Sequence, residues 1–250
     1  MSTNQLQEFN WKHAVLMFLL LFPLVLLLLI EPIPQKEAYH RFTDIAPFLG
    51  IPNFFDVISN LAFLLVGTIG IAFCLKNHTG PGHSAWLVLF AGVSLVGLGS
   101  IYYHWSPSNQ TLVWDRLPMS VGFMAFLTAL LSEYVNRRFS RLLIPLIIVG
   151  ISSVLYGYFF DDLRLYVWVQ FIPLLTLPFF MVLYNSGFTH QGLLFVALVL
   201  YALAKGAEAY DTAVFQMTGE IVSGHTVKHL LAAAGCYSIL IMLKRQKLIA

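Results

Sequence analysis

The sequence predicts an all-α fold, a polytopic bundle of transmembrane helices, and two observations support that prediction. Hydrophobic residues make up 58% of the 250 residues and charged residues only 10%, whereas about 25% of the residues of a soluble domain are charged. The mean hydropathy is +0.77, and the apolar residues gather in stretches of the length that a spanning helix needs, about 20 residues. This composition excludes a soluble enzyme and a disordered chain.

The charge balance and the cysteines narrow the class further. Fourteen basic and twelve acidic side chains give a net charge of +2, which would not attract a phosphate backbone, so no nucleic-acid partner is expected. Cys74 and Cys236 each lie inside an apolar run, which is typical of small core residues rather than of a disulfide or a metal-binding pair. The chain is interpreted as a multi-pass integral membrane protein.

Eight stretches are long and apolar enough to span a bilayer, and short loops rich in turn-forming residues separate them. Prolines inside the fifth and sixth stretches are tolerated in lipid, because neighbouring groups satisfy the freed carbonyls. The expected spans are residues 13–31, 56–76, 84–104, 113–132, 142–160, 164–184, 190–206 and 224–243.

The first stretch follows Lys12 and raises the question of a signal peptide. Its apolar run is longer than a usual signal core, no small-x-small cleavage site follows it, and Glu31-Pro32-Ile33-Pro34 is typical of a helix end. We therefore expect two units. Residues 1–31 would form a cytoplasmic tail and an extra transmembrane helix, and residues 32–250 a seven-helix membrane domain.

The basic residues of the loops predict the orientation, because cytoplasmic loops carry more Lys and Arg. With the first span retained, eight basic residues fall on one side of the membrane and five on the other. Both termini are therefore expected in the cytoplasm. The eight are Lys12, Lys76, Arg137, Arg138, Arg141, Lys244, Arg245 and Lys247, and the five are Lys36, Arg41, Arg116, Arg164 and Lys205.

Ionisable residues inside spans are costly and are therefore functional candidates. His225 and His229 are four residues apart in the last span, so they share a helix face and could bind one metal ion. Ser100 and His104 have the same spacing near the end of the third span. A loop of about ten residues should bring Asp115, at the start of the fourth span, back beside His104. All five then lie at one depth near the non-cytoplasmic face.

These residue types fit metal-assisted hydrolysis of a carbonyl compound. Three histidines around one ion with an open fourth position are the catalytic zinc pattern, and zinc lowers the pKa of a bound water to about 7. A carboxylate can transfer the proton to a leaving amine, and a hydroxyl can stabilise an oxyanion. The alternative is a polar network of Ser, His and Asp that holds the helices together. The spacing alone leaves both open.

Four segments resemble the alkaline ceramidase family, which belongs to a superfamily that includes the adiponectin-type receptors. They are FFDVISNL at 54–61, GLGSIYYH at 97–104, LVWDRLPM at 112–119 and SGHTVKHL at 223–230. The resemblance implies a seven-helix hydrolase that cleaves the N-acyl bond of a ceramide-like lipid. It implies a zinc ion bound by His104, His225 and His229, with Asp115 as general acid and base and Ser100 as its partner in catalysis.

The chain departs from that pattern in three places. The first span is an addition, and residues 48–53 lack the carboxylates with which the animal enzymes bind calcium, so no calcium site is expected. Arg116 stands where those enzymes have an acidic residue, a difference that bears on the substrate headgroup more than on the chemistry. The sequence is more similar to a bacterial branch, which implies the bacterial inner membrane and another N-acyl lipid as an alternative to ceramide.

Three other classes of membrane protein fit these residues less well than a metal-dependent hydrolase. A receptor-like protein with a non-catalytic zinc site would not need Asp115 beside the metal. A haem-binding carrier needs ligands on facing helices, whereas His225 and His229 share one face. A transporter is disfavoured because the charged residues gather at one face of the membrane.

The remaining polar residues are interpreted as structural. Asp56, Ser59 and Asn60 are expected in an interhelical network or cap, with cavity lining as the alternative. Lys205 and Glu208 are expected to pair on a helix surface, with headgroup contact as the alternative. Solvated positions are expected for Glu133, Asp161 and Asp162, and no ligand role for His13, His40, His78, His83 or His190.

Overall fold

The computed structural model describes residues 11–249, which form helices and no β-strand. The all-α prediction is therefore confirmed. In chain order the elements are α1 (Trp11–Leu29), the 3₁₀ turn η1 (Glu37–His40), α2 (Phe54–Ile58), α3 (Leu61–Lys76), α4 (His83–Trp105), α5 (Asn109–Leu130), the π-helical turn η2 (Leu131–Val135), the 3₁₀ helix η3 (Arg137–Leu142), α6 (Leu143–Phe160), α7 (Arg164–Leu183), α8 (Gly192–Ala209), α9 (Asp211–Met217) and α10 (Gly224–Arg245).

Eight helical segments of the described chain are long and apolar enough to span a membrane, as predicted. The second is broken, since α2 and α3 meet at Ser59 and Asn60. The fourth begins four residues before the predicted edge because Ser108 caps it. The Ser108 hydroxyl accepts from the Thr111 N–H at 3.2 Å, and the Thr111 hydroxyl accepts from the Ser108 N–H at 3.0 Å.

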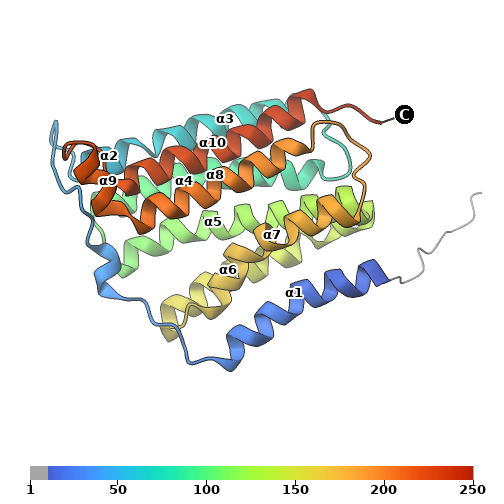
Figure 1. The fold of residues 1–250 in the computed structure, drawn as a ribbon, viewed down its shortest axis with the longest axis horizontal. Coiled ribbons are helices and arrows are strands. Elements are labelled where there is room, and N and C mark those ends of the chain that lie inside the picture. Colours follow the sequence, from blue (N-terminus) through green and yellow to red (C-terminus); the bar gives the residue numbers. More distant parts are fainter. Residues whose placement is uncertain (1–10, 250) are drawn as a thin grey trace, which may run out of the picture.

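The helices pack as a bundle with α5 at its centre (Figure 1). α4 packs on α5 and α3, and α10 packs on α8 and α3. In the most apolar stretch of the α5 span 78% of the residues are buried, whereas in that of the α1 span 6% are buried. α1 is thus a peripheral helix. The start of α1 and the end of α10 lie at one end of the bundle, and α2 and α9 lie at the other (Figure 1).

α1 is attached to the bundle through α7. The Trp168 indole donates to the Leu20 carbonyl at 2.9 Å, and the Arg164 guanidinium donates to the Ile30 carbonyl at 2.7 Å. Arg164 also pairs with Asp162 at 2.7 Å. The hydrogen bonds from Arg164 to the Asp162 carboxyl hold the pKa of that carboxyl below its usual range. The expectation that Asp162 is merely solvated was wrong, because this loop binds the end of α1.

Glu133 is also buried, against expectation. Its carboxylate accepts a hydrogen bond of 2.6 Å from the Trp86 indole of α4. The π-helical turn η2 extends the helical path of α5 through Val135, so Glu133 lies within the span and not in the following loop. A loop position had been inferred from the neighbouring arginines.

Glycines let α4 and α5 approach closely, as small residues do between membrane helices. A methyl group at Gly99 would overlap the carbonyl oxygen of Trp114, whereas one at Gly122 would lie 3.8 Å from Leu89, an ordinary contact. The backbones therefore touch at Gly99, one residue before Ser100.

We predict that Gly99→Ala lowers the free energy of unfolding by about 1–3 kcal/mol, the usual cost of overpacking. The measurement is thermal unfolding in detergent, with Gly122→Ala as the matched control. Equal melting temperatures for the two variants would contradict close packing of α4 on α5 at Gly99.

Candidate functional site

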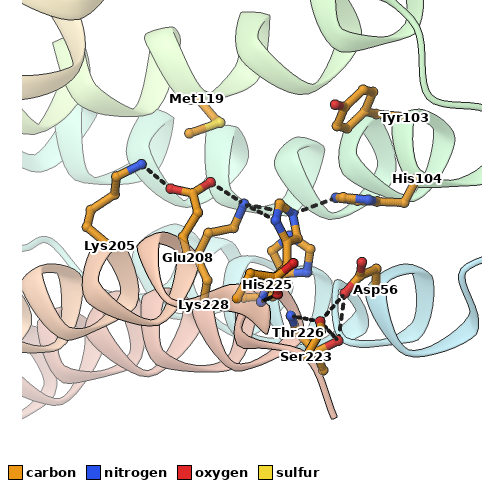
Figure 2. Close-up of polar contacts among 12 residues, drawn as sticks. Asp56, Tyr103, His104, Met119, Lys205, Glu208, Ser223, His225, Thr226 and Lys228 are labelled. Carbon is orange, nitrogen blue, oxygen red and sulfur yellow. Dashed lines mark hydrogen bonds and ion pairs between the residues drawn. The ribbon is translucent and has the colours of Figure 1, made fainter. Parts of the chain in front are cut away.

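Three buried histidines from α4 and α10 converge at the end of the bundle that also holds α2 and α9 (Figure 2). One nitrogen of each of His104, His225 and His229 lies within 4.8 Å of the other two. The Nε2 atoms of His104 and His225 are 3.2 Å apart. Zinc–nitrogen bonds of about 2.0–2.1 Å in a tetrahedral site place two nitrogens about 3.3 Å apart. The three side chains could therefore hold one metal ion.

The start of α10 fixes two of these histidines. The Ser223 hydroxyl caps the helix by accepting from the Thr226 N–H at 3.0 Å, and the His225 N–H donates to Asp211 at 2.8 Å. His225 and His229 follow one turn apart on the face toward α4, as the spacing predicted.

Asp56 holds the first turn of α10 against α2 (Figure 2). Its buried carboxylate accepts from the hydroxyl of Thr226 at 2.6 Å and from that of Ser223 at 3.1 Å. The interpretation of Asp56 as part of an interhelical network is confirmed. The sequence reasoning missed its two partners, because Ser and Thr are too common for their spacing to identify them.

Ser59 fixes the orientation of one histidine ring. Its hydroxyl is 2.8 Å from Nδ1 of His229, which leaves Nε2 of that ring for an ion. Such a hydrogen bond to the second nitrogen is typical of metal-binding histidines. Phe42 packs across the outer side of the site, with its ring centroid 4.7 Å from those of His104 and His225.

Asp115 and Ser100 lie together beside the histidines. Both side chains line a cavity of about 190 Å³, the site cavity, whose wall also includes His229. The hairpin was expected to bring Asp115 beside His104. The backbone of Asp115 lies beside Gly99 of α4, where a methyl group on the glycine would be 3.3 Å from the Asp115 Cα.

A chain of charged side chains reaches the histidines from α8 (Figure 2). Lys205 pairs with Glu208, and Glu208 also pairs with Lys228 of α10 at 3.0 Å. The Lys228 ammonium is 2.8 Å from Nε2 of His225. A metal ion bound to His225 would displace this contact, and Lys228 would then keep Glu208 as its partner. The surface-pair interpretation of Lys205 and Glu208 was therefore incomplete.

Sequence reasoning missed Lys228 altogether. The signal was present, because this lysine lies in an apolar span between His225 and His229, where an unpaired charge is costly. Among residues 11–249, His104, His225 and His229 form the one group of three metal-binding side chains. His40 bonds Tyr103 and Asn109 instead.

The site cavity adjoins two further cavities. On one side lies an apolar cavity of about 130 Å³, which shares with it Phe63, Val96, Met119, Tyr201 and Ala232. On the other side lies a larger cleft of about 600 Å³, the outer cleft, which shares with it Arg116, Leu163 and Tyr166. The polar residues therefore stand between an apolar space and a polar one.

Comparison with known proteins gives the family. The sequence model of the Ceramidase family matches residues 49–249, a range that includes Ser100, Asp115 and the three histidines but not α1. A comparison with curated proteins gave no match. The chain belongs to the Ceramidase family and is a multi-pass membrane hydrolase of amide carbon–nitrogen bonds.

Proposed function

We propose that this protein is a zinc-dependent hydrolase that cleaves the N-acyl amide bond of ceramide-like lipids, releasing a fatty acid and a sphingoid-type amine. The observation that carries the proposal is the meeting of three buried histidines with a cavity lined by a carboxyl and a hydroxyl. A metal-binding group beside a proton-transfer group is what amide hydrolysis requires.

His104, His225 and His229 would hold the ion. Their spacing and the hydrogen bond between Nδ1 of His229 and the Ser59 hydroxyl support a three-histidine site with the fourth position open. When bound, zinc supplies a Lewis acid that polarises a carbonyl and lowers the pKa of water to about 7.

Asp115 would act as general acid and base. Its carboxylate would accept the proton of the attacking water and transfer it to the nitrogen of the leaving amine. Ser100 lines the same cavity as Asp115. Its hydroxyl could therefore donate to the carbonyl oxygen as that atom gains negative charge.

The cavities support a lipid lying across the site. The acyl chain would occupy the apolar cavity, the amide the site cavity, and the amine part of the lipid would extend toward the outer cleft. Ceramide or another N-acyl lipid fits this arrangement.

We extend the proposal to the position of the protein in the membrane. The described ends of the chain lie at the end of the bundle opposite the histidines (Figure 1). With the excess of basic loop residues at that end, both termini would be cytoplasmic and the site non-cytoplasmic, in a bacterial inner membrane. α1 lies outside the matched range, which supports treating residues 1–31 as an addition to a seven-helix domain at 32–250.

We predict about one zinc ion per chain in protein purified in detergent without a chelator, and loss of the metal in His225→Ala. Metal content is measured by mass spectrometry, with His83→Ala, a histidine outside the site, as the control. Wild-type protein without metal would contradict the hydrolase mechanism and leave the polar residues as a packing network.

We predict that Asp115→Asn keeps its metal but loses amide hydrolysis by about 10²–10⁴-fold, the usual contribution of a general acid and base. Hydrolysis of an N-acyl sphingoid lipid in detergent micelles measures the effect. Glu133→Gln is the matched control, since it alters a buried carboxyl at the far end of the same span. Full activity in Asp115→Asn would contradict the role of Asp115 as general acid and base.

We predict that Ser59→Ala weakens zinc binding about 10–100-fold, because His229 loses the hydrogen bond that orients its ring. The measurement is competition for zinc against a chromogenic chelator. Ser153→Ala, which removes a buried hydroxyl of α6 that bonds only its own helix, is the control. Equal zinc affinities would mean that Ser59 does not orient the ligand.

A further inference from the structure

Arg116 lies at the junction of the site cavity and the outer cleft and lines both. Its guanidinium packs against two tyrosine rings, with centroids at 5.5 Å for Tyr39 and 4.9 Å for Tyr166. Tyr39 comes from the segment between α1 and α2, and Tyr166 comes from α7. The two rings hold the side chain in place through cation–π contacts.

The guanidinium lacks an anionic partner within the described residues. Its contacts there are the two rings, and no hydrogen bond or ion pair joins it to another side chain. The other two cations of the site cavity, Lys205 and Lys228, both pair with Glu208. Arg116 therefore offers five N–H donors, in the planar arrangement that matches a carboxylate or a phosphate.

The charges of the site cavity favour an incoming anion. Its wall holds three basic side chains and two carboxyls, Asp115 and Glu208. The Glu208 carboxyl is already paired with two lysines. The excess cation of the site cavity is Arg116. It also lines the outer cleft, where the carboxyls of Glu37 and Asp161 accept hydrogen bonds from the Asn109 amide and the Gln35 N–H.

The position of Arg116 indicates which part of the lipid it would meet. The apolar cavity lies on the other side of the site cavity, and Arg116 is not part of its wall. The carboxylate that hydrolysis leaves on the acyl chain would arise at the former amide carbon, beside the histidines of the site cavity, whereas Arg116 also lines the outer cleft. The group beside Arg116 would instead belong to the amine part of the substrate, which points toward the outer cleft.

We propose that Arg116 binds an anionic headgroup on the amine part of the substrate, so that the preferred lipids are N-acyl lipids bearing a phosphate or a carboxylate. This inference rests on the proposed amide hydrolysis for the identity of the ligand. Neutral ceramide would bind without that contact and would be the poorer substrate.

The test compares lipids that differ in a single charged group. An N-palmitoyl sphingoid base is compared with the same lipid phosphorylated at its 1-hydroxyl, and N-palmitoyl serine with its methyl ester. Binding of each intact lipid is measured in detergent with the Asp115→Asn variant, and hydrolysis with the wild-type protein. The phosphate pair and the carboxylate pair distinguish the two kinds of headgroup.

In Arg116→Gln the affinity for the anionic lipids should fall about 10–100-fold, the range for a hydrogen-bonded charged group, whereas the neutral lipids should bind as before. Arg116→Lys keeps the charge but not the planar donors, so its affinity for the anionic lipids should lie between that of the wild-type protein and that of Arg116→Gln. Arg141→Gln removes the same charge from the opposite end of the bundle and is the control.

The outcomes separate the two proposals. Equal binding of charged and neutral lipids, equal losses for both in Arg116→Gln, or no lipid binding at all would overturn the headgroup inference, even if the wild-type protein hydrolyses amides. A preference for the charged lipids that Arg116→Gln abolishes would support the inference, even if no amide is cleaved. In that last case the proposed hydrolysis alone would fail.

Discussion

The arrangement of the site depends on the hydrogen bonds that the buried carboxylate of Asp56 accepts from α10. Two hydroxyls in the first turn of α10 donate to it, and one turn further along the chain Ser59 bonds His229. A bilayer supplies no water to replace such contacts, so the position and rotation of α10 are tied to α2. Since α10 provides two of the three histidines, this attachment also fixes where His225 and His229 lie relative to His104.

The spans, and the position of Ser100, Asp115 and the three histidines at one end of the bundle, could be predicted because both follow from local rules. Apolar stretches of sufficient length must be helices in lipid, and a spacing of four places His225 and His229 on one face. The alternation of sides then brings the ends of the spans that hold Ser100, His104 and Asp115 to the same depth. None of these steps needs the rotation of one helix against another.

What could not be predicted depends on that rotation. Lys228 is one residue from a site histidine, yet only the packing of α10 on α8 reveals Glu208 as its partner. Glu133 was assigned to a loop because arginines follow it, but the π-helical turn keeps it inside the bundle beside Trp86. The close contact of α4 and α5 at Gly99, which places Asp115 beside that glycine, likewise depends on how the two helices pack.

The row of three cavities has a consequence for how the two reactants of a hydrolysis arrive. A lipid and a water molecule come from different phases, and the site cavity lies between a space of each kind. Gln35, Glu37, Asn109 and Asp161 make the wall of the outer cleft polar, so water can approach from that side while the acyl chain comes from the bilayer. The two reactants would then meet at the histidines from opposite directions, and neither would have to cross the other's solvent.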